Sequence, residues 1–260
     1  MSSAPRRFEG NVAIVTGAAH GIGQAIAAAL LREGATVYGL DVDAAALEQA
    51  ARAPASLGRF IGITADVSDA AAVTRALEAV LSGARRLDVL VNNAGINMGK
   101  RIAELEIKDW ERVFDVNLKS VYLMCRAAWP TFVRQHRGAI VNVASVMGQV
   151  GGIGAPAYCS TKAGIIMLSR CLAKDGASHG IRVNSVCPGY IDTPIMDRVL
   201  DAMPDSVKAR AELNQRMPLG RLGRPEEIGA AVLFLASADA AYISGTELTI
   251  DGAVTATQID

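Results

Sequence analysis

The chain has 260 residues, 51% of them apolar, and its 26 lysines and arginines balance 26 aspartates and glutamates. This length is ample for a buried core, and the neutral balance argues against nucleic acid or an anionic membrane surface as a partner. The sequence contains neither an apolar run of about 18 residues nor a signal-peptide core, so we expect a cytoplasmic protein with no membrane partner.

Cysteine and histidine usage bears on redox state and metal binding. The chain has four cysteines, at Cys125, Cys159, Cys171 and Cys187. Because no Cys-x-x-Cys pair occurs, we expect free thiols, each a small side chain that fills the core. The three histidines are His20, His136 and His179. They lie far apart in the sequence and none pairs with a cysteine at the spacing of metal ligands, so no metal is expected.

Short β-branched runs alternate along the chain with helical stretches rich in alanine and leucine. Strands are expected at Val12–Thr16, Thr36–Leu40, Phe60–Ile63, Val89–Val91, Ala139–Val143, Ile181–Val186 and Glu247–Ile250. Helices are expected near Ile22–Glu33, Ala44–Ala51, Asp69–Leu81, Ile107–Gln135, Pro156–Gly176 and Pro225–Ser237. Near-continuous apolar strands joined by helices indicate an α/β fold with a parallel sheet covered on both faces.

No linker, repeat or low-complexity tract divides the chain, so we expect one domain over residues 1–260. The least regular region runs from Tyr190 to Arg224 and carries several prolines and methionines. A long segment of this kind after a strand is often a lid over a site, although an ordinary pair of surface helices fits nearly as well.

The first junction between a predicted strand and a predicted helix is rich in glycine. It reads Thr16-Gly17-Ala-Ala-His20-Gly21-Ile22-Gly23. Glycines let the backbone turn sharply and approach a pyrophosphate, whose charge would meet the N–H groups of the helix that opens at Ile22. His20 either touches a phosphate or fills a polar position in the loop, and the loop position is favoured.

Carboxylates follow the second and third predicted strands. Asp41 ends the second strand, where it would accept hydrogen bonds from both hydroxyls of the adenosine ribose and repel a 2′-phosphate. NAD is therefore favoured over NADP, although Asp41 could instead start the next helix alongside Asp43. Asp66 and Val67 close the third strand, and Asp66 could reach the adenine amino group or equally cap the helix that begins near Asp69.

Asparagines follow the fourth strand and interrupt the next helical stretch. The segment Asn92-Asn93-Ala94-Gly95 places small residues at the carboxyl end of the fourth strand, which leaves space for a ligand. Asn117 lies inside a long helical stretch, where asparagine is a poor helix former. It is either exposed without a function, or its amide supports a kink that holds a water molecule beside Lys162.

Tyr158 and Lys162 are four residues apart on one helical face, so their side chains can meet. A lysine ammonium about 5 Å from the phenol, at an effective dielectric of about 20, would lower the pKa of the phenol by roughly two units, towards the range of an acid–base catalyst. Ser145 lies thirteen residues before Tyr158, just past the strand at Ala139–Val143, so its hydroxyl could point towards the phenol. On its own, the Tyr-x-x-x-Lys spacing is found more often on an ordinary helix face with a solvated lysine than in an active site.

The turn after the sixth strand begins with Pro188 and Gly189. Its tight course could hold Ile191 and Thr193 against the carboxamide of a nicotinamide. Because both this turn and the glycine-rich junction follow the carboxyl end of a parallel strand, they would lie at the same edge of the sheet.

Together these motifs resemble the classical short-chain dehydrogenase/reductase family, from about Gly10 to Gly252. The glycine-rich junction matches the family's Thr-Gly-x-x-x-Gly-x-Gly loop, and the segment after the fourth strand matches its Asn-Asn-Ala-Gly motif. The family's catalytic tetrad falls on Asn117, Ser145, Tyr158 and Lys162. The resemblance implies a Rossmann-type, doubly wound sheet of seven parallel strands. It also implies, commonly, a homotetramer whose interface includes residues near 225–236 and 246–251.

The reaction implied by the resemblance interconverts a secondary alcohol and its ketone with NAD. As a phenolate, Tyr158 would remove the hydroxyl proton while hydride passes to NAD⁺, and Ser145 would hydrogen-bond the substrate oxygen. Lys162 would lower the pKa of the tyrosine and hold the hydroxyls of the nicotinamide ribose. Asn117 would anchor a water molecule that links Lys162 to solvent.

The substrate is expected to meet Met147, Gln149 and Tyr190, together with Ser145 and Tyr158. These walls offer no cationic clamp, so a neutral polyol, sugar or cyclic alcohol is favoured. An NADPH-dependent 3-oxoacyl-[acyl-carrier-protein] reductase is the alternative among enzymes. A protein that senses NAD(H) without turning it over is a more remote alternative, because it would not need the serine, tyrosine and lysine together.

Overall fold

Seven parallel strands form one sheet in the computed structural model, which describes residues 6–52, 58–201 and 203–256. The strands are β1 (Val12–Thr16), β2 (Thr36–Asp41), β3 (Phe60–Thr64), β4 (Val89–Asn92), β5 (Gly138–Val143), β6 (Ile181–Pro188) and β7 (Glu247–Ile250). Their order across the sheet is β3-β2-β1-β4-β5-β6-β7. β1, β4 and β5 are almost wholly apolar and buried on both faces, as strands covered by helices on each side must be.

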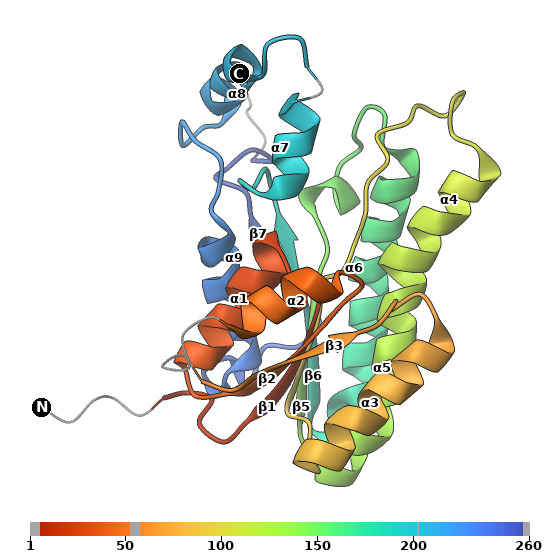
Figure 1. Cartoon of the computed structure of the whole chain (residues 1–260), viewed down its shortest axis with the longest axis vertical. Coiled ribbons are helices and arrows are strands. Elements are labelled where there is room, and N and C mark those ends of the chain that lie inside the picture. The colour runs from red at the N-terminus through yellow and green to blue at the C-terminus, as the bar shows by residue number, and fades with distance from the viewer. Residues whose placement is uncertain (1–5, 53–57, 202, 257–260) are drawn as a thin grey trace, which may run out of the picture.

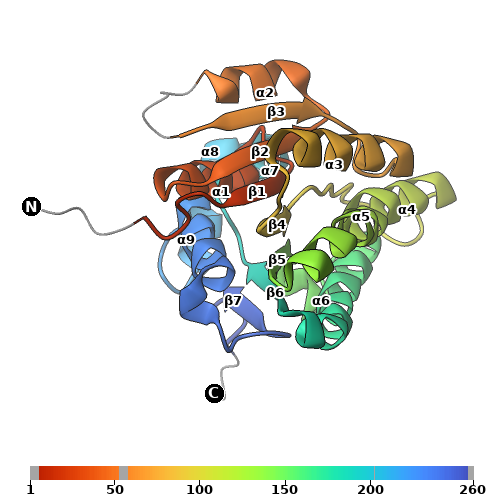
Figure 2. The ribbon, with the colours of Figure 1, turned by 90° about the horizontal axis from the view of Figure 1, so that it is seen from below.

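The helices cover both faces of the sheet (Figures 1 and 2). They are α1 (Gly21–Arg32), α2 (Ala44–Ala51), α3 (Ala70–Ala84), α4 (Ile107–Phe114), α5 (Ser120–Gln135), α6 (Pro156–Gly176), α7 (Pro194–Asp201), α8 (Ser206–Arg216) and α9 (Pro225–Ala236). Residues of α1 and α9 join one core cluster, and residues of α3, α5 and α6 join the other. The predicted doubly wound α/β fold is therefore confirmed.

The strand order places a switch point between β1 and β4. The chain moves outward from β1 to β2 and β3, then returns to the other side of β1 and continues towards β7. Connections on the two sides of this point diverge, so the carboxyl ends of β1 and β4 border a crevice, the usual ligand site of such sheets. The glycine-rich junction and the Asn93–Gly95 segment both lie at this crevice.

The helical stretch expected over Ile107–Gln135 is not one α-helix. A π-helical segment at Asp115–Lys119 separates α4 from α5 and contains Asn117. Such one-turn bulges occur where a side chain takes part in another interaction. The side chain of Asn117 does so by bonding to the backbone of Ile96, so it is buried in an irregular helical turn rather than exposed, and the water molecule expected beside Lys162 stays a prediction.

The region from Tyr190 to Arg224 forms the helices α7 and α8 above the carboxyl edge of the sheet (Figure 1). Among its described residues α8 has none that is buried, so apolar packing contributes little to holding it in place. Instead, the Arg210 guanidinium pairs with Asp192 and Asp197, and the Asn214 amide oxygen accepts a hydrogen bond from the backbone N–H of Leu222. This is a pair of surface helices in the position where a lid would lie.

The structure bears on two expectations from composition, one about the cysteines and one about membrane-spanning segments. The four thiols are free, but only Cys125 and Cys187 are buried, and Cys171 is exposed, so the expectation that all four fill the core is wrong. Position 171 lies on the outer side of the long helix α6, where any small side chain is tolerated. Within the described residues, no helix combines the length and apolar character needed to span a bilayer.

Candidate active site

The glycine-rich loop after β1 is built so that the backbone packs against itself. Gly17 has φ of +64°, and a Cβ there would lie 2.9 Å from Asn93 Nδ2. A Cβ on Gly23 would lie 2.0 Å from the carbonyl oxygen of Gly17, a distance that no side chain can occupy. Both positions therefore require glycine, and the loop leaves bare backbone at the crevice where a pyrophosphate could approach closely.

The first backbone N–H groups of α1, like those of any α-helix, have no partner within the helix and can bind an anion. His20 precedes the helix but its side chain makes no capping hydrogen bond, and no acidic residue lies in the first turn. The His20 ring lies 3.1 Å from Asp43 Oδ2, which supports the polar loop position rather than a phosphate contact. Ile22 packs against the core beneath the loop, so only its backbone faces the crevice. A helix N-terminus with free amides and bare glycine backbone fits a dinucleotide pyrophosphate.

Asp41 ends β2 beside the same loop. Its Oδ2 accepts a hydrogen bond from the N–H of Ala19 at 3.1 Å, and its Oδ1 accepts one from the N–H of Asp43 at 3.1 Å. Each carboxylate oxygen has a second lone pair, so both can still accept bonds from a ligand. Asp43, not Asp41, caps α2 by accepting from Ala46, so the alternative role for Asp41 as a helix start is not what the structure shows.

The turn after β3 is held by its own side chains. Asp66 Oδ1 accepts hydrogen bonds from the N–H and the hydroxyl of Ser68, and Asp66 Oδ2 lies 3.3 Å from the Arg112 guanidinium. These bonds hold the pKa of Asp66 below its usual value although burial opposes them. Asp69 is the cap of α3, and the Val67 side chain is buried in the core, so only its backbone could meet an adenine.

Thr16 organises the crevice and was not singled out from the sequence. Its hydroxyl accepts hydrogen bonds from the N–H groups of Asn93, at 2.9 Å, and Ala94, at 3.1 Å. The Asn93 side chain returns the contact by donating to the carbonyls of Thr16 and Gly17. The end of β1 and the segment after β4 are therefore joined into one rigid wall. A signal was present, since a polar residue ends an otherwise apolar buried strand.

Ser145 and Tyr158 meet at the carboxyl end of β5. Ser145 follows that strand and is buried, and its hydroxyl also accepts a hydrogen bond from the N–H of Met147 at 3.1 Å. Tyr158 lies in the first turn of α6, where Pro156 starts the helix. Burial raises the pKa of the Tyr158 phenol, and the Ser145 hydroxyl opposes this rise, so the serine lies close enough to act on the phenol.

Lys162 lies one helical turn from Tyr158, with its ammonium 5.4 Å from the centre of the phenol ring. It is buried and donates to the carbonyl of Val143 at 2.8 Å. Burial raises the pKa of Tyr158 above its usual value and lowers the pKa of Lys162 to about 8. This is opposite to the direction expected for the tyrosine from the lysine charge alone. An ammonium that is itself desolvated and engaged with a carbonyl does not offset the burial of the phenol.

Asn117 completes the arrangement from the π-helical segment. Its Oδ1 accepts from the N–H of Ile96 at 2.8 Å, and its Nδ2 donates to the carbonyl of Ile96 at 2.9 Å and to the Thr161 hydroxyl at 3.2 Å. A Cβ on Gly95 would lie 3.3 Å from Asn117 Oδ1 and 3.6 Å from Lys162 Nζ. A larger residue than glycine at this position would therefore press against both the asparagine and the lysine side chains.

The turn after β6 approaches the glycine-rich loop from the other side. A Cβ on Gly189 would lie 2.7 Å from the Cβ of Asp251, the residue after β7, so only glycine fits after Pro188. Thr193 faces the loop, since its methyl would be 3.4 Å from a Cβ on Gly21. The Ile191 side chain is buried in the core, so any contact of this residue with a nicotinamide would come from its backbone.

The three residues expected to form substrate walls are not brought together by contacts with one another. Met147 is half-buried, and its methyl lies against Gly152, next to the Cys159 sulfur. Gln149 is exposed and its amide exchanges hydrogen bonds with the Thr249 hydroxyl on β7. Tyr190 is 40% exposed and borders a small pocket of about 120 Å³ beneath the segment that follows α8.

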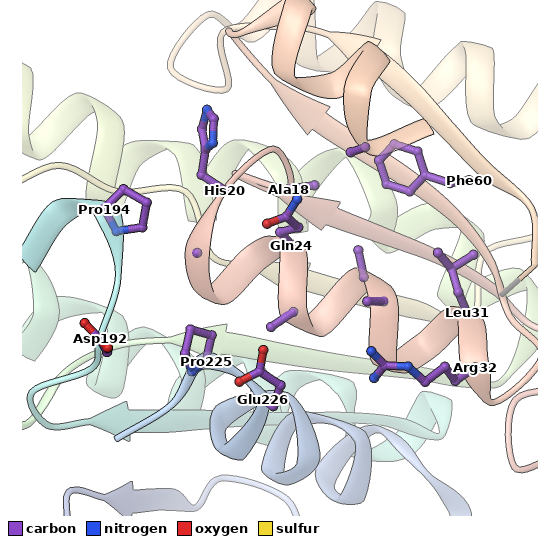
Figure 3. A pocket seen from close by; sticks show the side chains of 15 residues that line it. Ala18, His20, Gln24, Leu31, Arg32, Phe60, Asp192, Pro194, Pro225 and Glu226 are labelled. Carbon is purple, nitrogen blue, oxygen red and sulfur yellow. The ribbon is translucent and has the colours of Figure 1, made fainter. Parts of the chain in front are cut away.

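A larger groove of about 430 Å³ follows α1 (Figure 3). It begins beside His20 and Gly21 and ends near Leu31, Arg32 and Phe60. None of the four tetrad side chains lines it. The groove therefore meets the site at the glycine-rich loop and at the turn after β6, and the tetrad lies outside it, at the crevice formed by the strand ends.

The chain is similar to several known proteins over nearly its whole length. A family model described as Enoyl-(Acyl carrier protein) reductase matches residues 17–255. Cyclopentanol dehydrogenase of Comamonas testosteroni is 41% identical over 253 residues, covering 96% of this chain and 99% of that one. The 3-oxoacyl-[acyl-carrier-protein] reductase FabG of Thermotoga maritima is 39% identical over 247 residues, covering 95% and 98%. Meso-2,3-butanediol dehydrogenase of Serratia marcescens is 37% identical over 250 residues, covering 96% of each.

A solved structure gives the same result at the level of the fold. A Burkholderia xenovorans protein assigned as a short-chain dehydrogenase/reductase superposes with a TM-score of 0.93 at 34% identity, covering 97% of this chain and 99% of that one. Such agreement in sequence and fold shows that the chain belongs to the classical short-chain dehydrogenase/reductase family, whose nicotinamide-dependent oxidoreductases act on CH–OH groups.

Proposed function

We propose that the protein interconverts a neutral secondary alcohol, such as a polyol, sugar or cyclic alcohol, and its ketone with NAD(H). The influence of Ser145 on the pKa of Tyr158 supports the proposal that an alcohol beside the crevice would be held by both oxygen atoms. A nicotinamide would supply the two-electron acceptor and a positive charge near the phenol. The single observation that carries the choice of NAD is the Asp41 carboxylate beside the glycine-rich loop.

Each tetrad residue has a distinct role in this proposal. Tyr158 takes the hydroxyl proton of the alcohol, and Ser145 holds the substrate oxygen in line with the phenol. Lys162 supplies positive charge and hydrogen-bond donors one helical turn from the tyrosine. Asn117 fixes the loop at Ile96 through two hydrogen bonds, which keeps the wall beside Lys162 in place.

The choice of NAD predicts the effect of one substitution. Asp41→Asn should lower the preference for NAD⁺ over NADP⁺, measured as the ratio of kcat/KM values, by about tenfold or more, because the repulsion of a 2′-phosphate is removed. The amide oxygen can still accept one of the two backbone bonds, so the loop should remain folded. Asp43→Asn is the matched control: it also removes an exposed negative charge at this edge and should leave the preference nearly unchanged. An equal change in both variants would contradict the role of Asp41.

The similarity to 3-oxoacyl-[acyl-carrier-protein] reductase FabG supports a second candidate, reduction of a 3-oxoacyl thioester with NADPH. The relatives that act on butanediol and cyclopentanol support the first. A panel of small polyols and cyclic alcohols with NAD⁺, run beside acetoacetyl thioesters with NADH and NADPH, separates the two. A higher kcat/KM for a thioester with NADPH than for any alcohol with NAD⁺ would reject the first candidate.

We also propose that the protein works as a homotetramer. Phe234 on α9 is 38% exposed and Tyr242 before β7 is fully exposed, although both are large and apolar or aromatic. Burial of such side chains between copies would stabilise an assembly. A molar mass close to that of four chains is expected from light scattering, and Phe234→Asp should lower it. A mass of one chain in the unsubstituted protein would contradict this proposal.

A further inference from the structure

A chain of buried polar side chains crosses the core beneath the site. Asn92 Nδ2 donates to Asn142 Oδ1 at 2.8 Å, and Asn142 Nδ2 donates to the Ser169 hydroxyl at 2.8 Å. Ser169 in turn donates to the carbonyl of Ile165 at 2.7 Å. Asn142 and Ser169 have no exposed surface at all, and Asn92 is 4% exposed. Uncharged polar groups this deep in a core are costly unless they are paired, so their positions are strongly fixed.

Each member of this polar chain lies on an element that carries part of the site. Asn92 ends β4, directly before the segment that forms the crevice wall. Asn142 lies on β5, three residues before Ser145. Ser169 lies on α6, two helical turns after Lys162. The bond from Asn142 to Ser169 therefore joins the element that holds the serine hydroxyl to the helix that holds the phenol and the ammonium.

Apolar packing alone would not fix α6 as tightly against the sheet. Ile165, Ile166 and Ala173 bury the same helix in the core cluster, but apolar contacts tolerate a small slide or rotation. A hydrogen bond is directional and loses strength with a few tenths of an ångström of displacement. The bond between Asn142 and Ser169 thus limits how far the helix can move relative to β5.

The polar chain is also not an optimal way to gain stability. Among the described residues, Asn92 Oδ1 is a buried side-chain oxygen without a hydrogen-bond partner. Leaving a buried acceptor unpaired costs free energy that an apolar residue at the same place would avoid. These hydrogen-bonded side chains cost stability and yet link three elements that carry the site. This indicates that they hold the residues of the site in position.

We propose that Asn142 and Ser169 are positioning residues, which set the distance between the Ser145 hydroxyl and the Tyr158 phenol by fixing α6 against β5. The proposal rests on the assignment of Ser145 and Tyr158 in the proposed function. Neither residue touches the reacting atoms. Their effect passes through the position of α6, which carries Tyr158, relative to β5, which leads into Ser145.

The test measures the pKa of Tyr158 directly, without substrate. The ultraviolet absorbance of the phenolate is titrated in each protein and in the same protein carrying Tyr158→Phe, and the difference reports Tyr158 alone. Ser169→Ala removes the acceptor for Asn142 Nδ2, so α6 should move and carry the phenol away from the Ser145 hydroxyl, which opposes the rise of the phenol pKa. We expect the pKa of Tyr158 to rise by about half a unit or more. The kcat should fall about tenfold, with the dissociation constant of NAD⁺ changed by less than about twofold.

Thr131→Val is the matched control. Thr131 is also buried on a helix of this face, but within the described part of the chain its hydroxyl bonds only to Arg134 of the same helix, α5. This variant loses a buried hydroxyl and should show no change in the pKa of Tyr158. A second comparison places Ser169→Ala in an Asn142→Ala background, where it should have no further effect on the pKa or on kcat.

The outcomes separate the positioning role from simple destabilisation. An unchanged pKa in Ser169→Ala, or an equal rise in Thr131→Val, overturns the proposal, as does a full additional effect in the Asn142→Ala background. If Asn142→Ala does not fold, the comparison of Ser169→Ala with Thr131→Val decides alone. Absence of turnover with every alcohol in the unsubstituted protein would reject the proposed function, and the titration would still decide the positioning role.

Discussion

Replacing Tyr158 with phenylalanine is expected to abolish measurable turnover, a loss of roughly 10²–10⁴-fold in kcat, while the protein still binds NAD⁺. The phenol is the group on whose pKa Ser145 acts, and phenylalanine keeps the ring that fills the space. Binding of the dinucleotide depends on the glycine-rich loop and Asp41, which this change does not touch. Steady-state kinetics and the quenching of protein fluorescence by NADH measure the two effects separately.

Two further variants make the result specific. Tyr242→Phe removes a phenol that is fully exposed and far from the tetrad in sequence, and kcat should be unchanged. Ser145→Ala removes the hydroxyl that holds the substrate oxygen, and its loss in kcat should not add in full to that of Tyr158→Phe, because the two groups act as a unit. Appreciable turnover in Tyr158→Phe would remove the tyrosine from the role of acid–base catalyst.

Much of the fold follows from local patterns in the sequence. The runs Val12–Thr16 and Val89–Asn92 are apolar on both faces, which is how a central strand of a covered parallel sheet reads. Glycines between the first strand and the first helix place a backbone-lined turn at the carboxyl edge. The spacing of Tyr158 and Lys162 fixes them on one face of a helix. These features depend on neighbours within a few residues, so they can be predicted without the structure.

Other features depend on partners distant in the sequence, and local patterns cannot predict them. The π-helical segment around Asn117 exists because this side chain bonds to Ile96, twenty-one residues earlier. Burial raises the pKa of Tyr158, and the sequence does not show that the phenol is buried. The bounds of α8 cannot be read from the sequence, because this helix has no buried residue among those described and its apolar residues show no periodicity.

Replacing Lys162 with methionine is expected to inactivate the enzyme and yet to stabilise the folded chain. Lys162 is 3% exposed, and among the described residues its ammonium bonds only to the carbonyl of Val143. Burial lowers its pKa from 10.5 to about 8, so the charge costs roughly 3 kcal/mol of folding free energy at neutral pH. Methionine has a similar length and no charge, and the lost hydrogen bond to Val143 costs about 1 kcal/mol. A net gain of about 2 kcal/mol, seen as a higher midpoint in denaturant, is expected at pH 7 without nucleotide.

The pH dependence of this gain tests its cause. Below pH 8 the lysine is protonated in both the folded and the unfolded chain, so the cost and the advantage of the variant are at their full size. Between pH 8 and 10.5 the unfolded chain holds the proton more strongly, so the unsubstituted protein gains stability with rising pH and the advantage shrinks. Lys100→Met is the control, because Lys100 is half-exposed and pairs with Asp109, which raises its pKa, so that variant should gain no stability. Two results would contradict this explanation: a Lys162→Met variant that is less stable than the unsubstituted protein at pH 7, or one whose gain in stability is the same at pH 7 and pH 10.5. Either would show that burial of the Lys162 charge does not destabilise the folded chain.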